Sequence, residues 1–191
     1  MVGGARRQAY VFARQSDGSW AEEQILTPTG GQTTDQFATA VSLSGDRALV
    51  GAYQDSDRAA SAGALYVFER QASGTWMQTA KLYAPAPNGA DSFGVSLAQS
   101  GDQVLAGADT RGGNVNGGAG AAYLFVHNAD GSWSAPVEVK SGVNDVTPSR
   151  MFGSDVSLSG NFALIGAMYD VGNNGSQTGA AYVADVRAVL P

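Results

Sequence analysis

Oxygen-bearing side chains gather in three segments of the chain, at spacings that suit a hard cation or a pair of catalytic carboxylates. The segments contain Asp55 with Asp57, Asn114 with Asn116, and Asp170 with Asn173. Carboxylate and amide oxygens are the ligands that Ca²⁺ takes in proteins, and two carboxylates around one sugar form the acid and base of a glycosidase. Asp and Asn are also the ordinary residues of turns. We therefore predict no metal site, no cofactor and no catalytic residue, with an enzyme acting on polysaccharide as the alternative.

Composition excludes several other functions. The 191 residues include 11 Lys and Arg against 17 Asp and Glu, for a net charge of −6, so the chain lacks the positive charge that binds nucleic acid. Without cysteine there is no thiol catalysis and no Cys-ligated zinc. No apolar run reaches the roughly 18 to 20 residues of a membrane span.

The only histidine, His127, stands where matching segments have Arg14 and Arg70, which predicts an exposed and structurally neutral site. A Ser/His/Asp triad and a multi-histidine metal centre are excluded, because both need histidine in a defined constellation.

The elements that position these residues are indicated by a long internal repeat. Tyr10, Tyr66, Tyr123 and Tyr182 are separated by 56, 57 and 59 residues, and Trp20, Trp76 and Trp133 follow at 56 and 57. The turns Ser44-Gly45-Asp46, Ser100-Gly101-Asp102 and Ser159-Gly160-Asn161 recur in the same order. Self-similarity at a fixed period is the signature of a repeat architecture.

Each repeat contains the pattern of four short strands and no helical periodicity. The first strand runs from a Phe to the Ser-Gly turn, and the second, such as 48–52, is apolar at successive positions, so both its faces should be buried. The third contains the repeated Tyr, and the fourth opens with the repeated Trp. We expect the Trp side chains and the third-strand Tyr and Phe to pack between sheets. The sequence therefore predicts an all-β fold of β-propeller blades, each a four-stranded antiparallel meander.

The repeat boundaries divide the chain into a partial blade at 1–36, blades at 37–92 and 93–151, and a partial blade at 152–191. These contain about thirteen strands, fewer than a closed propeller of four to eight blades needs. We expect a partial or open propeller of about three to four blades: a fragment of a longer protein, an arc that other copies complete, or an open arc. The opening residues lack the apolar core of a signal peptide, and the array starts at a third strand, which favours the fragment.

The long connections should all project from one face, because direction reverses at every turn of a meander. They are 53–62, 109–119 and 168–178 after second strands, and 27–36, 83–92 and 140–151 after fourth strands. Varied loops on a rigid scaffold are where binding residues concentrate. The candidate ligand-face residues are Asp55, Asp57, Arg58, Asp109, Arg111, Asn114, Asn116, Tyr169, Asp170 and Asn173.

Phe93-Gly94 and Phe152-Gly153 open two repeats, and a Gly-Ala pair such as Gly107-Ala108 closes each second strand. Over residues 9 to about 186 this pattern resembles the FG-GAP repeat of integrin α-chain-like β-propellers, in the bacterial and environmental branch with a short turn after the first strand. The resemblance implies a complete propeller of about seven blades, an extracellular or cell-surface setting, and ligand binding or adhesion rather than catalysis.

The chain departs from the family pattern at three points. Phe37 is followed by Ala38 instead of Gly, and Tyr53, Asp109 and Met168 replace the Pro of the family name. The calcium loop of many members is reduced to the Ser-Gly turn, which is too short for six to eight oxygen ligands. We expect an interaction module that presents its long loops to a protein or glycan, with the polysaccharide enzyme or a structural spacer as alternatives.

Overall fold

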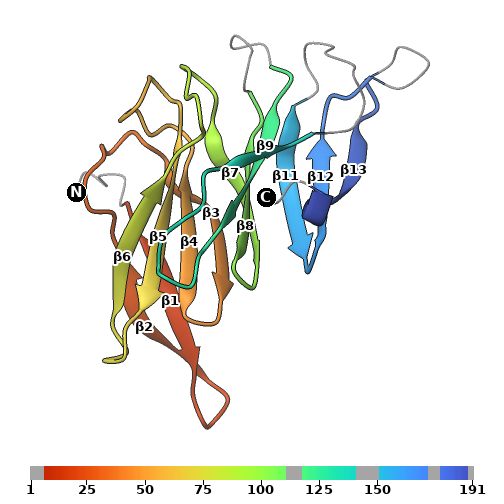
Figure 1. Ribbon diagram of the computed structural model, residues 1–191. Coiled ribbons are helices and arrows are strands. Elements are labelled where there is room, and N and C mark those ends of the chain that lie inside the picture. The colour runs from red at the N-terminus through yellow and green to blue at the C-terminus, as the bar shows by residue number, and fades with distance from the viewer. Residues whose placement is uncertain (1–6, 111–117, 141–150, 172–176, 189–191) are drawn as a thin grey trace.

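The computed structural model describes residues 7–110, 118–140, 151–171 and 177–188. In these ranges the chain forms thirteen strands in four antiparallel sheets that stand side by side (Figure 1). The outer sheets are β1 (Ala9–Arg14) with β2 (Trp20–Leu26), and β11 (Phe152–Ser159), β12 (Phe162–Ala167) and β13 (Ala180–Asp185), which the 3-10 helix η1 (Val186–Ala188) follows. The all-β fold of partial propeller blades is confirmed.

The two inner sheets are complete meanders of four strands in chain order. One contains β3 (Phe37–Ser44), β4 (Arg47–Ala52), β5 (Ala64–Arg70) and β6 (Trp76–Leu82). The other contains β7 (Phe93–Ser100), β8 (Gln103–Ala108), β9 (Ala121–Val126) and β10 (Val137–Val139). β10 starts later than predicted and excludes Trp133, which forms only an isolated bridge with His127. Pro136 lies just before β10 and has no N–H to donate to a ladder.

The predicted first-to-second hairpins are present. Ser44 pairs with Arg47 around Gly45 and Asp46. Gly45 has a φ of 55°, and Asp46 is not among the residues with positive φ. Positive φ at the first central residue alone defines the type II′ turn, whose twist matches that of the flanking strands.

The sheets pack face to face in sequence. We call the face toward the preceding sheet the front and the face toward the following sheet the rear. Leu49, Leu65 and Val67 on the rear of β3–β6 pack with Phe93 and Tyr123 on the front of β7–β10. A similar cluster joins β7–β10 to β11–β13. These apolar contacts between neighbouring sheets form the core.

The Phe-Gly and Gly-Ala pairs meet where neighbouring sheets come closest. A Cβ built on Gly51 would lie 2.0 Å from the carbonyl oxygen of Gly94, and one on Gly63 would lie 2.1 Å from that of Phe93. Gly94 itself has a φ of 87°. Gly63 and Phe93 also form a parallel bridge between the two sheets. Glycine is required here because backbone from one sheet occupies the space of a side chain on the other.

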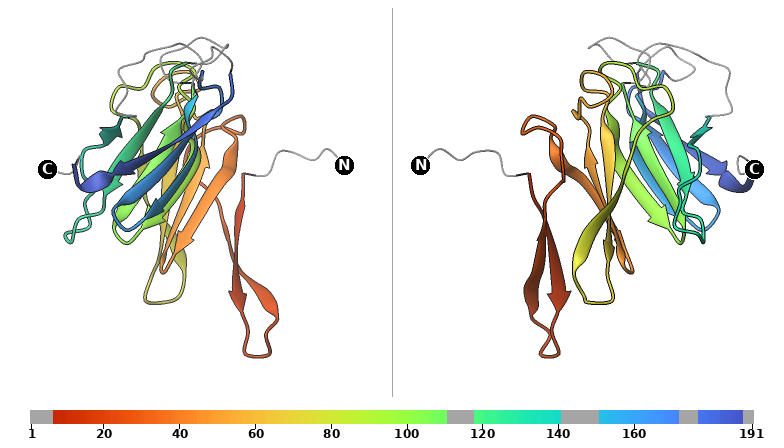
Figure 2. Two further views of the ribbon diagram at one scale, coloured as in Figure 1. Left: turned by 90° about the vertical axis from the view of Figure 1, so that its right-hand side faces the viewer. Right: turned by 60° about the vertical axis from the view of Figure 1, so that its left-hand side comes forward.

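Side chains on the outer sheets differ from the prediction where a neighbouring sheet is missing. Trp76 is buried, but Trp20 is 67% exposed, and Tyr10 and Phe12 are half exposed. They lie on the front of the β1–β2 hairpin, which stands at the edge of the array with no described sheet before it (Figure 2). The prediction that all repeated Trp, Tyr and Phe side chains are core is therefore wrong for this hairpin.

The second strands show the same effect at the other edge. β4 and β8 are buried on both faces, as predicted. In β12 exposed and covered residues alternate, and Phe162 and Leu164 are exposed. The rear of β11–β13 faces no described sheet, so burial on both faces fails there.

His127 is not the exposed, neutral residue that the sequence predicted. Its ring lies 4.8 Å from the Trp133 ring, and Arg47 Nη2 lies 2.7 Å from its Nδ1. Arg47 also forms ion pairs with Glu69 and Asp102 and lies over the Trp133 ring. His127 therefore helps to join two blades at the hairpin end of the array.

Candidate functional site at the long-loop face

The described parts of all long connections lie at one end of the sheets, opposite the hairpin turns (Figure 1). This confirms the predicted common face, which we call the loop face. Between β4 and β5, and between β6 and β7, the connections are described in full. They come from neighbouring strands of one rigid sheet, so their side chains are held in fixed positions relative to one another.

Asp55 closes the loop between β4 and β5. Its backbone N–H donates to the carbonyl of Ala52 (3.0 Å), and its carbonyl accepts from the N–H of Gly63 (2.9 Å). The buried carboxylate accepts a 2.9 Å hydrogen bond from the hydroxyl of Tyr66. Burial and this carboxylate raise the pKa of Tyr66 to about 12. Asp55 thus ties the start of the loop to the third strand beneath it.

Lys81, at the end of β6, lies between two carboxylates of that loop. Its Nζ is 2.6 Å from Asp55 Oδ2 and 2.5 Å from Asp57 Oδ2. The ammonium also lies 4.7 Å from the centre of the Tyr66 ring. Burial alone would lower the pKa of Lys81, but hydrogen bonds to the two carboxylates raise it above its usual value. Lys81 therefore keeps its positive charge at neutral pH and links the β4–β5 loop to β6.

The outer part of this group is open to solvent. Arg58, which is exposed, stacks over the ring of Tyr83 at 4.6 Å from its centroid. The Tyr83 hydroxyl donates to Asp57 Oδ2 at 3.3 Å. The hydrogen bond from Lys81 holds the pKa of Asp57 below its usual value. Asp57, Arg58 and Tyr83 form what we call the loop cluster: a carboxylate, a guanidinium and a phenol held side by side next to the partly buried Lys81.

Three other predicted ligand-face residues, Asp109, Tyr169 and Asp170, follow the second strands of other sheets. Asp109 is buried after β8, and burial raises the pKa of its carboxyl group. Asp170 is buried after β12, where it accepts a hydrogen bond from Tyr182. Tyr169 beside it is exposed. The predicted Arg111, Asn114, Asn116 and Asn173 lie outside the described residues.

Two residues of the site were not predicted. Lys81 stands where the matching repeats have Ile25 and Glu138, and Tyr83 stands where they have Thr27 and Lys140. The available signal was a residue that differs from its equivalents in both other repeats, because strand residues that serve packing tend to recur.

In residues 7–110, 118–140, 151–171 and 177–188, no three or more His, Asp or Glu side chains gather in a group that could hold a metal ion. In the same ranges no helix has the length and apolarity needed to cross a membrane.

Comparison with known families agrees with the repeat. The model of the FG-GAP repeat matches three segments, residues 20–68, 76–125 and 143–184. No curated protein matches the chain. Each matched segment opens at or near a fourth strand and ends in a third strand, so each runs across the junction between two sheets.

Proposed function

We propose that this chain, which belongs to the FG-GAP repeat family, is a non-enzymatic interaction module. Its loop face binds a protein or a glycan outside the cell or at its surface. The observation that supports this most is the loop cluster. Arg and Tyr are enriched at the energetic centres of interfaces. Here the Arg58 guanidinium stacks on the Tyr83 ring, and the Tyr83 hydroxyl donates to Asp57. A preorganised surface loses less conformational entropy when a partner binds.

The carboxylates of this face support binding better than catalysis. Asp55 is bonded to Tyr66 and Lys81, and Asp170 is bonded to Tyr182. A glycosidase needs two carboxyl groups that face the substrate from a shared pocket. The buried carboxylates hold the loops, whereas the exposed side chains next to them are those suited to contact a partner.

The proposal is tested by binding rather than by turnover. The purified chain is screened against a glycan array and a library of secreted and surface proteins, and each hit is measured again with Arg58→Ala and Tyr83→Ala. If the loop cluster is at the centre of the interface, each substitution should weaken the binding free energy by about 2 kcal/mol or more.

The matched control is Arg14→Ala, which removes another exposed arginine, at the end of β1 next to a hairpin turn at the opposite end of the molecule (Figure 1). It should leave binding unchanged. Hits that respond to Arg14→Ala and not to the loop-cluster substitutions would place the binding surface elsewhere. Turnover of a polysaccharide by the wild-type chain would favour the enzyme instead.

A further inference from the structure

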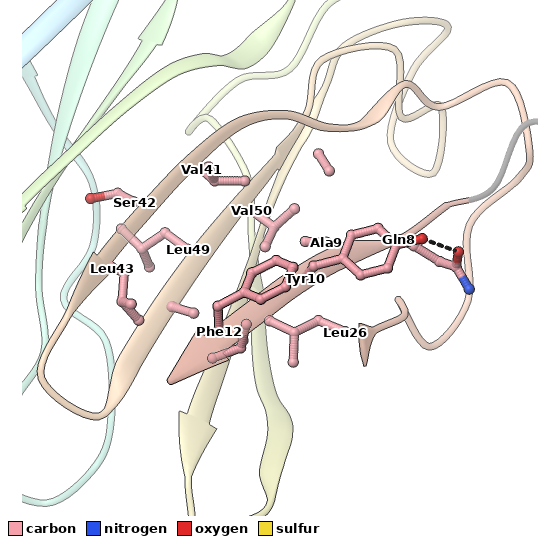
Figure 3. A pocket seen from close by; sticks show the side chains of 13 residues that line it. Gln8, Ala9, Tyr10, Phe12, Leu26, Val41, Ser42, Leu43, Leu49 and Val50 are labelled. Carbon is pink, nitrogen blue, oxygen red and sulfur yellow. Dashed lines mark hydrogen bonds between the residues drawn. The ribbon is translucent and has the colours of Figure 1, made fainter. Parts of the chain in front are cut away.

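An apolar hollow of about 400 Å³ lies between the β1–β2 hairpin and the front of the next sheet (Figure 3). Val41 and Leu43 of β3 line it and are 62% and 59% exposed. Their equivalents in β11, Val156 and Leu158, are buried against the preceding sheet. The floor of the hollow is therefore a surface that, in a repeat preceded by a complete four-stranded sheet, is covered by that sheet.

The strand beside the hollow has an open edge. β5 pairs with β4 and β6, and β9 pairs with β8 and β10, so each third strand of the inner sheets has two partners. Within the described residues β1, the equivalent third strand, pairs only with β2. The site thus combines an apolar floor with unpaired backbone groups, which is the surface that β-strand addition requires. What it lacks is the first and second strand of a blade.

The opposite end of the array has the complementary surface. Phe162 and Leu164 on the rear of β12 are 55% and 47% exposed, and Val183 of β13 is also exposed. Leu49 and Leu105, the equivalents of Leu164, are fully buried by the following sheet. One end of the array therefore leaves the front of a sheet uncovered, and the other end leaves the rear of a sheet uncovered. Between the two inner sheets, the same front and rear surfaces pack against each other.

We propose that the hollow binds strands β11 and β12 of a second copy of this chain, and that β12 of that copy pairs with β1. The internal contacts predict the register. Gln99 Nε2 donates to the carbonyl oxygen of Arg47 at 3.2 Å across the β3–β6 and β7–β10 sheets. Leu43 is the equivalent of Gln99 and Phe162 that of Arg47, so Leu43 of one copy faces Phe162 of the other. At the two open ends both of these positions carry exposed apolar side chains, Leu43 and Phe162.

The second copy fits because it brings an equivalent strand to exchange. β1 and β13 are both third strands and share Ala-Tyr-Val, at residues 9–11 and 181–183. Only one of them can lie next to β12. In the proposed complex β1 replaces β13 there, and β2 supplies the fourth strand that the described β11–β13 sheet lacks. Exchange of equivalent elements between protomers is a low-cost route to a dimer.

The strand count agrees with a closed pair. The thirteen strands of the described residues, less the displaced β13, make three blades of four in each copy. Two copies then make six blades, within the four to eight of closed propellers. In this dimer each end of one copy meets the opposite end of its partner.

The test is the mass of the full chain in solution, measured by sedimentation and light scattering over a concentration series. The wild type should dimerise. Leu43→Asp and Phe162→Asp, one at each end, should each raise the dissociation constant at least about tenfold. Met77→Asp changes an exposed apolar residue of β6 outside the hollow and should have no effect. Circular dichroism of every variant checks that it folds.

A mixture of the two variants distinguishes this contact, between opposite ends of two copies, from a contact between identical ends. Leu43→Asp mixed with Phe162→Asp forms a pair in which one of the two contacts is wild type, so the mixture should associate more tightly than either variant alone. Because the chain has no cysteine, Leu43→Cys mixed with Phe162→Cys should also give a disulfide-linked dimer, and Leu43→Cys mixed with Met77→Cys should not. A monomeric wild type, or a dimer that neither aspartate weakens, or a mixture that does not recover, would overturn the proposal.

Discussion

Lys81 is held by two carboxylates whose surroundings differ. The Asp55 side chain is fully buried, whereas that of Asp57 is 46% exposed. Removal of one partner from a buried ion pair leaves an uncompensated charge, which costs about 3–5 kcal/mol. An exposed ion pair contributes about 0–1 kcal/mol. We therefore expect Lys81→Met to lower the free energy of unfolding in urea far more than Asp57→Asn does.

The double variant Lys81→Met with Asp55→Asn serves as the control for this prediction. It removes both charges, so it should recover part of the stability that Lys81→Met alone loses. Equal, small losses in Lys81→Met and Asp57→Asn would mean that the Asp55 carboxylate is not desolvated in solution.

Tyr66 should make the fold sensitive to alkaline pH. Its pKa is about 12 in the fold against 10.0 for a free tyrosine. Between these values the folded chain keeps the phenol proton and the unfolded chain releases it, so stability falls as pH rises. Below pH 10 the contribution is fully present. The unfolding midpoint in urea should fall more between pH 9 and pH 11 for the wild type than for Tyr66→Phe, and equal slopes would contradict the prediction.

At the scale of the element, the junction between blades depends on one backbone position. Gly94 and Ala38 both follow the opening Phe, and both have positive φ, 87° and 69°. Gly94 lies against the preceding sheet, where an added Cβ would meet the carbonyl oxygen of Ala64 at 2.7 Å. Among the described residues Ala38 follows only the β1–β2 hairpin, which has no second strand there to contact it, and this allows a side chain at this position.

The reverse substitutions Gly94→Ala and Ala38→Gly should therefore change stability in opposite directions. Gly94→Ala adds both a close contact and backbone strain, and should cost about 3 kcal/mol or more of unfolding free energy. Ala38→Gly removes strain and should add up to about 1 kcal/mol. Both values are measured by urea unfolding at neutral pH. A loss of stability in Ala38→Gly would show that its side chain contributes more by packing than it costs in strain.

The sequence repeat predicts structural features that depend on a few consecutive residues. It does not predict features that depend on which sheets are adjacent. Strands, the Ser-Gly turns and the common loop face follow from patterns of a few residues, and all are found. Trp20 and Trp76 have the same place in the repeat, but only Trp76 has a sheet before it. Lys81 occurs in one repeat, and His127 contacts Arg47 of another blade. These contacts depend on which sheets are adjacent, and the repeat alone does not contain that information.

At the scale of the whole molecule, stability should be highest in the middle of the array. β4 and β8 are buried on both faces and pair on both edges, whereas β1–β2 is a two-stranded hairpin with an exposed front. In repeat proteins stability is approximately a sum over units and their contacts with neighbours, and an isolated hairpin is marginally stable in water. The hairpin should therefore unfold locally while the rest of the chain stays folded.

Amide hydrogen exchange of the dilute monomer measures this gradient strand by strand. β4 and β8 should exchange slowest, at rates set by global unfolding, and β1 and β2 should exchange fastest among the strands. Gln24→Ala removes the two hydrogen bonds that the Gln24 side chain makes with the backbone of Trp76. It should speed exchange in β1 and β2 and leave β8 unchanged. Equal protection in all four sheets would show instead that the array unfolds as one cooperative unit.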